Sequence, residues 1–350
     1  METERRLTGT NMVSIKTIAE KCGVSIATVS KALNGHTDVG EQTKEMVLET
    51  AKQLGYMPNS QARALKTNKT YNIGVLLDDK AKSGLTHPFF SAVIDGFRVE
   101  CAKEGYDITL VNILNSKVGT QKMSCYQHCV YRNVDGVLAT CVDFYSDEIM
   151  ELMDSDMPIL SIDFKRDRSH SVSSNNAAGL RSIVEYAYSC GHKKIAYIYG
   201  ESAQVTTTRL NSYLDTMKEL GLPVQPDYLR QGKYIDTELT EKIVTEMLEL
   251  FDPPTCIILP DDVAALGARN AAAKLGKTIP DDFSIVGYDG ISLCKLIKPE
   301  LTTYCQDSYE MGRQAALKLI RLIEKCVPEN EPYDVLVDGF LSKGNTVSKI

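Results

Sequence analysis

Apolar residues recur at helical spacing between residues 14 and 54, with polar side chains between them. Ser14 can cap a first helix, which Gly23 ends in a tight turn, and Ser25 can cap a second helix, which stops at Asn34. A third helix is expected over about residues 42–54. Two short helices around a glycine-containing turn predict a helix-turn-helix, although any capped helical bundle shares this pattern. The third helix would close the core with Val47, Leu48, Ala51 and Leu54.

From residue 72 the pattern changes to short β-branched runs that alternate with helical stretches. Runs such as N-I-G-V-L-L and D-G-V-L-A-T are separated by helices, and this βαβ order predicts a parallel, doubly wound sheet. A second series begins after Gly191 with K-I-A-Y-I-Y. We therefore expect two α/β lobes, with a ligand cleft beyond the carboxyl ends of their strands.

The composition is that of a globular protein of two or more domains, with 350 residues and 43% hydrophobic side chains. The longest apolar runs are far shorter than the roughly 18 residues of a membrane span. The first dozen residues lead into no apolar segment typical of a secretory signal. We therefore expect a cytoplasmic protein with no membrane contact, whose ten cysteines stay reduced.

The net charge of −7 is unevenly distributed along the chain. Residues 1–71 hold ten Lys or Arg against seven Asp or Glu, a net charge of +3, which leaves −10 for the rest. A basic module joined to an acidic one is expected when one part meets phosphates and the other has a different role. Chance fluctuation in a short window would give the same figure.

Catalytic and metal signatures are weak. Cys125, His128 and Cys129 are spaced for one helix face, but a zinc site needs four ligands and no second pair lies at a suitable distance, so a half-buried helix is the preferred interpretation. G-K-T at residues 276–278 lacks the first glycine of a phosphate loop, because Ala271 stands there. We expect no enzyme activity, no cofactor and no metal.

The second predicted helix carries an unusual outward face. Its amphipathic pattern leaves Ile26, Ala27, Thr28 and Lys31 pointing to solvent. Small apolar side chains at the start of a helix suit contact with thymine methyl groups, and a lysine suits guanine acceptors or phosphate.

Three segments carry a family resemblance: V-S-I-A-T-V-S-K-A-L-N-G, the corner L-G-Y-M-P-N and the run A-R-A-L. In this order and spacing the chain closely resembles the lactose/galactose-repressor (LacI/GalR) family of bacterial transcription regulators. The resemblance implies an α/β fold with a helix-turn-helix head and a hinge helix. A two-lobed body of doubly wound parallel sheets, like that of periplasmic binding proteins, would follow.

The resemblance also assigns DNA contacts by position. Ile26, Ala27 and Lys31 would read bases, and Leu65 of the hinge helix would wedge into the minor groove. Gly40 departs from the usual Ser or Thr cap of the third helix. Phosphate and hinge contacts would come from Ser14, Thr28, Ser30, Asn34, Asn59, Arg63 and Lys66.

For the body, the resemblance points to an effector site between the lobes. Arg209 would clamp the effector and Asp289 would bind the same ligand, since together they offer donors and acceptors to vicinal hydroxyls. Phe90 and Gln306 are also candidates for contact with the effector, and a role in core packing or at a lobe interface explains each of them equally well. The carboxylate of Asp262 fits a helix N-cap. The remaining effector candidates are Asp79, Phe89, Asp163, Tyr234 and Asp261.

The family topology suggests domain bounds that include three crossings between lobes. They are a head at 12–58, a hinge at 59–71, an N-lobe at 72–166 and 292–327, and a C-lobe at 167–291 and 328–350. The N-lobe would regain a late helix over about residues 308–324.

The sequence thus predicts a transcription regulator, and a repressor is the favoured kind. It would bind a pseudo-palindromic operator as a homodimer, and a tetramer is the alternative assembly. A small molecule between the lobes would switch it. A sugar is favoured over a purine, because residues 201–208 lack an arginine that purine-responsive members carry. The alternative is a periplasmic-type solute-binding protein without a DNA function.

Overall fold

The computed structural model describes residues 13–57, 69–78, 83–113, 117–118 and 121–350. The chain forms two compact units, which meet in sequence between Thr70 and Tyr71. None of the helices in the described ranges is long and apolar enough to cross a membrane.

The first unit is a three-helix head. The helices are α1 (Ile15–Cys22), α2 (Ile26–Leu33) and α3 (Glu41–Gln53). Ser14 and Ser25 cap α1 and α2 through their side chains, whereas Gly40 starts α3 with no side-chain hydrogen bond. Leu48, expected in the core, is instead 45% exposed because the inward face of α3 is formed by its neighbours. The core consists of Ile18, Ala19, Val29, Ala32, Val39, Val47 and Ala51.

The first lobe of the second unit is built on a parallel six-stranded sheet in the order β13-β7-β6-β5-β1-β2. Helices α5 and α13 pack against strand side chains of this sheet in one apolar core. Helices α6 and α7 pack against other side chains of the same sheet in a second apolar core. The sheet consists of β1 (Asn72–Leu77), β2 (Asp107–Leu110), β5 (Gly136–Thr140), β6 (Ile159–Ile162), β7 (Ser171–Ser174) and β13 (Asp334–Val337). The helices are η1 (Gly84–Thr86), α5 (Pro88–Lys103), α6 (Cys125–Tyr131), α7 (Asp147–Met153) and α13 (Ser308–Glu324), and a small hairpin joins β3 (Lys117–Val118) to β4 (Gln121–Lys122).

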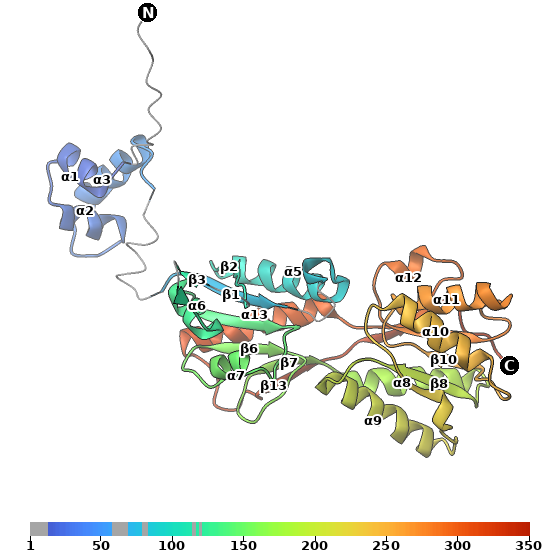
Figure 1. The fold of residues 1–350 in the computed structure, drawn as a ribbon. Coiled ribbons are helices and arrows are strands. Elements are labelled where there is room, and N and C mark those ends of the chain that lie inside the picture. The colour runs from blue at the N-terminus through green and yellow to red at the C-terminus, as the bar shows by residue number, and fades with distance from the viewer. Residues whose placement is uncertain (1–12, 58–68, 79–82, 114–116, 119–120) are drawn as a thin grey trace, which may run out of the picture. The chain divides into compact units, whose positions relative to one another are not determined.

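The second lobe repeats the plan with the order β14-β12-β11-β10-β8-β9, and of the strands described in this sheet β14 is the antiparallel one. Figure 1 shows α8 and α9 on one side of this sheet and α10 and α11 on the other. Its strands are β8 (Ile195–Tyr199), β9 (Leu229–Gln231), β10 (Cys256–Ile258), β11 (Ser284–Asp289), β12 (Thr302–Cys305) and β14 (Phe340–Ser342). Its helices are α8 (Asn176–Ser189), α9 (Gln204–Glu219), η2 (Pro226–Tyr228), α10 (Thr237–Leu248), α11 (Ala264–Leu275) and α12 (Leu293–Leu296).

The expected lobe boundaries need correction, although the three crossings and the late helix are present. Residues 171–174 and 334–337 pair with each other and belong to the first sheet, not to the C-lobe. Residues 302–305 pair with β11, which places 292–305 in the second lobe. The crossings follow β7, β12 and β13. These assignments depend on pairing between strands far apart in sequence, which a local pattern does not contain.

The packing of α5 against α13 depends on two glycines. A Cβ atom on Gly312 would lie 1.9 Å from the carbonyl oxygen of Val93, and one on Gly96 would lie 2.2 Å from that of Tyr309. Backbone therefore meets backbone along this contact, which ties the late helix firmly to the first lobe.

Candidate nucleic-acid interface and ligand cavity

The start of α2 is held by a local cap. The Ser25 hydroxyl accepts a hydrogen bond from the Thr28 backbone N–H at 3.0 Å, and Ser14 plays the same role for Thr17 of α1 at 3.3 Å. Such caps satisfy N–H groups that the helix leaves free. Ser14, expected to contact phosphate, therefore serves the fold while remaining exposed.

The outward face of α2 carries the candidates for base contacts. Ile26 is 49% exposed, and Ala27 and Lys31 are also exposed, whereas Thr28 and Ser30 are half-buried. The helix buries Val29 and Ala32 instead. An apolar and basic face is thus left open on the second helix of the head, while the inward face is used for packing.

Lys31 has a partner that the sequence did not suggest. Its Nζ donates to a carboxylate oxygen of Asp38 at 2.5 Å, and this hydrogen bond lowers the pKa of Asp38. Asn34, exposed at the end of α2, donates through Nδ2 to the Ser30 carbonyl oxygen at 2.6 Å. Lys31 must give up its bond to Asp38 to bind DNA. Loss of that bond reduces the net free energy that Lys31 contributes to DNA binding. Five further candidates lie outside the described residues, namely Asn59, Arg63, Leu65 and Lys66 of the hinge and Asp79 of the body.

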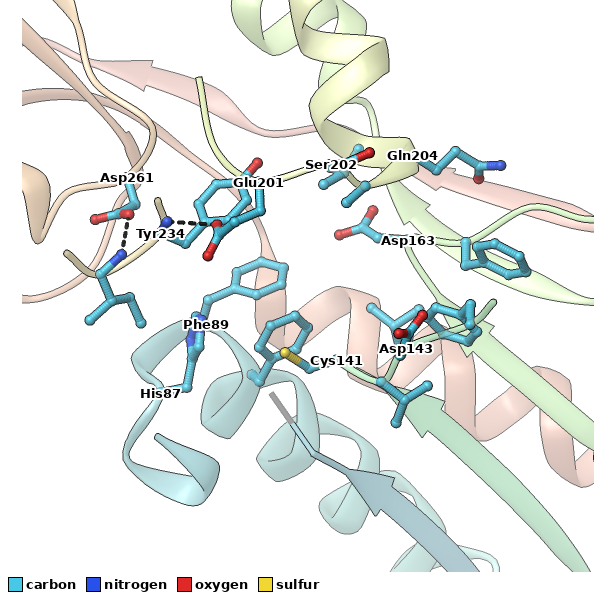
Figure 2. A pocket seen from close by; sticks show the side chains of 18 of the residues that line it. His87, Phe89, Cys141, Asp143, Asp163, Glu201, Ser202, Gln204, Tyr234 and Asp261 are labelled. Carbon is cyan, nitrogen blue, oxygen red and sulfur yellow. Dashed lines mark hydrogen bonds between the residues drawn. The ribbon is translucent and has the colours of Figure 1, made fainter. Parts of the chain in front are cut away.

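In the second unit a cavity of about 230 Å³ is lined by both lobes. Figure 2 shows its labelled side chains around one space, with Phe89, Cys141 and Asp163 from the first lobe and Tyr234 and Asp261 from the second. Ligand sites of two-lobed α/β proteins occur at such strand ends. All the described effector candidates line it: Phe89, Phe90, Asp163, Arg209, Tyr234, Asp261, Asp289 and Gln306.

Strained backbone is concentrated around this cavity. Cys141, Asp163 and Ile235 have φ values of 50°, 56° and 58°, and Asp289 has φ of 113°. All four line the cavity. Non-glycine residues rarely adopt such conformations, which cluster at ligand sites because the surrounding fold holds them there.

Arg209 is buried at the centre of the second-lobe wall, on α9. Its Nε donates to the Asn176 side-chain oxygen at 2.7 Å and its Nη1 to the Pro260 carbonyl oxygen at 3.4 Å. The guanidinium also lies over the Tyr288 ring, 3.7 Å from the ring centroid. These contacts fix the plane of the guanidinium, as a clamping role requires.

Asp289 and Gln306 lie side by side at the second-lobe end of the cavity. The Gln306 Nε2 donates to Asp289 Oδ1 at 2.7 Å. Gln306 thus faces the ligand space rather than serving the core alone. Phe90 also lines the cavity while its ring packs against the first-lobe core, so the two interpretations of this residue hold together.

The neighbouring aspartates after β10 divide their roles differently from the expectation. Asp261 accepts hydrogen bonds from the backbone N–H groups of Ala264, the first residue of α11, and of Ile235, both at 2.8–2.9 Å. The N-cap position itself is Val263, which makes no side-chain hydrogen bond. Asp262 does not cap this helix: it accepts from the Ile291 N–H and the Thr303 hydroxyl and so ties the segment after β11 to strand β12. The N-cap interpretation of Asp262 is wrong, because the side chain that meets an N–H group of the first turn is that of Asp261.

The buried carboxyl groups are shifted toward their neutral forms. Burial raises the pKa of Asp163 to about 6, against the hydrogen bonds from the Ser174 N–H and Asn176 and the charge of Arg209. Burial also raises the pKa values of Asp289 and Asp261, again opposed in part by Arg209 or by backbone donors. A ligand that donates hydrogen bonds to such a carboxyl group stabilises its charged form, which burial disfavours.

Several lining residues escaped the sequence reasoning. The rings of Phe144 and Phe164 stack in parallel with centroids 4.3 Å apart, and Tyr145 meets Phe164 edge-on at 5.6 Å. These aromatic residues follow β5 and β6, where the rule on strand ends could have found them. The others include His87, Asp143, Glu201, Ser202 and Gln204.

One further contact joins the lobes at the rim. Gln204 begins α9 in the second lobe, and its side chain accepts from the Lys165 N–H at 2.6 Å and donates to the Lys165 carbonyl oxygen at 3.0 Å. Lys165 follows β6 in the first lobe. Because one amide satisfies both backbone groups, these two bonds act together to hold the lobes close.

The Cys125, His128 and Cys129 group belongs to the first-lobe core. Both cysteines are fully buried in the apolar cluster beneath α6, and His128 Nδ1 lies 3.1 Å from the Asn112 carbonyl oxygen. Within the described ranges no group of His, Cys, Asp and Glu is arranged to hold a metal ion. Gly276, weighed above as part of a phosphate loop, ends α11 in the left-handed conformation.

Residues 14–59 match the lacI family of bacterial regulatory proteins, and residues 184–339 match the periplasmic binding protein-like domain. The transcriptional repressor PurR of Pasteurella multocida is 30% identical over 331 residues, covering 92% of this chain and 96% of that protein. The repressor CytR of Escherichia coli K12 is 31% identical over 310 residues, covering 88% and 89%.

Solved structures show the same architecture. The lac repressor dimer bound to operator and an anti-inducer aligns with a TM-score of 0.80 at 24% identity, over 96% of this chain and 99% of that chain. A LacI family regulator from Enterococcus faecium with bound ribose aligns with a TM-score of 0.67 at 26% identity, over 80% and 99%.

Proposed function

Because the chain belongs to the LacI family of bacterial regulatory proteins, we propose that its head binds operator DNA as half of a homodimer, under the control of a small molecule in the interlobe cavity. The family consists of transcriptional repressors rather than enzymes, and the chain is a DNA-binding repressor of this kind. Such a regulator acts where the chromosome lies, in the bacterial cytoplasm.

The observation that carries the proposal is one face of α2. Ile26 and Ala27 are exposed at its first turn and Lys31 follows one turn later, while the opposite face forms the head core. The second helix of a helix-turn-helix enters the major groove and reads bases with its N-terminal residues. Thr28, Ser30 and Asn34 flank this face and would contact phosphates. Ser14 would do so from α1.

Two heads related by a two-fold axis would read a pseudo-palindromic operator. The hinge residues Asn59, Arg63, Leu65 and Lys66 would order in the complex, because an eight-residue helix is marginal without a partner helix and DNA. This requirement lets the body control DNA binding: only a body that brings both hinges together allows both heads to bind.

The effector is proposed to be a sugar or sugar derivative. Arg209 and Asp289 offer donors and acceptors from one wall, and Phe89, Phe90 and Tyr234 offer faces for the apolar side of a ring. The Enterococcus faecium regulator described above holds ribose, which supports this class. Binding between the lobes favours one lobe orientation over another, and a coupling of about 1–3 kcal/mol is typical of such switches.

The test of DNA recognition uses the full chain and a library of random double-stranded DNA. Selection by binding should enrich a pseudo-palindromic site, because two identical heads bind its halves. Lys31→Ala should weaken binding to the selected duplex about tenfold or more and relax the preference at one base pair of each half-site. Gel shifts across single-base variants of the duplex measure both effects.

Lys52→Ala is the matched control, because Lys52 is an exposed lysine of the head that belongs to the last turn of α3 rather than to α2. It should leave base preference unchanged. A library that yields no enriched sequence at low salt would refute the DNA function and favour a solute-binding protein. Equal base preferences for wild type and Lys31→Ala would refute the role of Lys31.

A further inference from the structure

The walls of the interlobe cavity hold many more acidic than basic side chains, although burial raises the pKa values of Asp163, Asp261 and Asp289. Six carboxylates line it, and Arg209 is the one lysine or arginine among its described lining residues, with His87 as a further titratable nitrogen group. Figure 2 shows Asp143, Asp163 and Glu201 around the same space. The full set of lining carboxylates is Asp78, Asp143, Asp163, Glu201, Asp261 and Asp289.

The guanidinium of Arg209 does not offset this excess for a ligand. Two of its nitrogens already donate, to Asn176 and to the Pro260 carbonyl, and its face lies on the Tyr288 ring. An incoming anion would therefore meet one cation, two of whose N–H donors are already used, among six acidic side chains. Repulsion between like charges in a site partly withdrawn from water is costly.

The cavity also holds acceptors that lack protein donors. Gln306 is only 7% exposed, and its Oε1 has no hydrogen-bond partner among the described residues. Its orientation is fixed, because its Nε2 donates to Asp289 Oδ1. A buried acceptor without a partner costs free energy that a ligand donor would recover.

Three of the lining carboxylates likewise have an oxygen atom that receives no hydrogen bond from the part of the protein that the structure describes. Asp163 receives the hydrogen bonds of Ser174 and Asn176 at a single oxygen, Oδ1. Glu201 receives the Tyr234 N–H at Oε2, and Asp289 receives Gln306 at Oδ1. Each of these three carboxylates therefore has its second oxygen available for a ligand that donates.

We propose that the effector is a hydroxylated molecule with a protonated amine, and that phosphorylated and carboxylated molecules are excluded. The proposal rests on the proposed function of the cavity as the effector site. An ammonium group donates three hydrogen bonds and accepts none, which matches walls rich in acceptors. Phe144, Tyr145 and Phe164 add ring faces and edges near the carboxylates, and ring faces attract cations.

The test compares molecules that share one skeleton and differ in charge. Triads of neutral sugar, amino sugar and sugar phosphate are built on glucose, galactose and mannose. A fourth triad contains adenosine, an amino-deoxyadenosine and adenosine monophosphate. Thermal unfolding of the full chain at pH 7.5, with each compound at millimolar concentration, measures binding through stabilisation.

We expect an amine to raise the melting temperature by several degrees, its neutral partner to raise it less and the phosphate to leave it unchanged. A phosphate or a neutral member that stabilises the protein more than its amine would overturn the proposal. A panel in which no amine stabilises the protein would also overturn it.

A charge-neutralising variant separates the contribution of the amine to affinity from that of the hydroxyl groups. Glu201→Gln should reduce affinity for the binding amine about tenfold or more and affinity for its neutral partner much less, as measured by calorimetry. Asp215→Asn is the matched control, since Asp215 is an exposed acid of α9 outside the cavity. Equal losses for amine and neutral partner in Glu201→Gln would contradict the charge argument.

The two proposals fail separately in a gel shift with the selected duplex. If a sugar phosphate binds and changes DNA affinity, the ligand class is wrong and the proposed switch stands. If an amine binds without changing DNA affinity, the ligand class stands and the proposed switch is wrong.

Discussion

Asp163 illustrates how a single residue can cost stability and serve binding. Its pKa of about 6 means that the fold disfavours the ionised form. The unfolded chain ionises it near pH 4, so the contribution of Asp163 to stability falls as pH rises from about 4 through 6. Burial of the carboxyl group causes this rise in pKa; the Ser174 N–H and the charge of Arg209 oppose it, and the nearby Asp334 adds to it.

Asp163→Asn should therefore stabilise the free protein at pH 7.5. Asparagine can accept the hydrogen bonds of Ser174 and Asn176, and it tolerates the φ of 56° at this position. The gain in melting temperature should shrink at pH 5, where the wild-type carboxyl is mostly protonated, while effector binding weakens at pH 7.5. Calorimetric melts at both pH values measure this. A variant that melts below wild type at pH 7.5 would contradict it.

At this scale the sequence predicted residues whose chemistry is distinctive. Arg209 and Asp289 lie on the cavity as the family resemblance implied, and so does Gln306. The Asp261 and Asp262 pair was misassigned, because a capping pattern cannot say which of two adjacent carboxylates reaches the helix N–H groups. The partner of Lys31 was missed because no local rule places a residue seven positions away across a helix end.

Among the elements, the contact between the start of α9 and the segment after β6 offers the sharpest prediction. Gln204→Ala removes both hydrogen bonds to Lys165 that join the lobes at the cavity rim. Each net hydrogen bond contributes about 0.5–1.5 kcal/mol, so effector affinity should fall about fivefold to a hundredfold. X-ray scattering should also show a larger radius of gyration for the effector-free variant.

Thr208→Ala is the control, because the Thr208 hydroxyl donates only to the backbone of its own helix. It should leave both the affinity and the radius unchanged. Unchanged effector affinity in Gln204→Ala would show that the two bonds do not help to close the lobes.

The elements themselves were largely predictable. Serine caps and glycine stops placed the head helices to within a residue, and alternating β-branched runs gave two doubly wound sheets. The edge strand β13 and its neighbour β7 were assigned to the wrong lobe. Their neighbours in the sheet are 163 residues apart in sequence, at Ser171 and Asp334, and such pairing is decided by the folded molecule.

For the whole molecule, the charge split between head and body has a functional counterpart. A head with a net charge of +3 over residues 1–71 is only mildly basic, and the body at −10 repels DNA. One head alone would bind weakly, so affinity depends on two heads binding together. Any event in the body that changes the spacing of the heads therefore has a large effect on DNA occupancy.

This dependence makes the link between the two sites measurable. If effector and operator act through one equilibrium of the body, the factor by which the effector changes DNA affinity must equal the factor by which DNA changes effector affinity.

A substitution of Arg209 tests the same link from the side of the cavity. Arg209→Ala should lose the effector response while DNA binding is retained, because Arg209 lies in the cavity of the second unit and not in the head. Arg209→Lys guards against a folding defect, since it keeps the positive charge but not the bond to Asn176. Calorimetry with and without the selected duplex, beside gel shifts with and without the effector, gives the two factors. Unequal factors in the wild type would rule out a single shared equilibrium, and intact effector affinity in both variants would place the effector elsewhere.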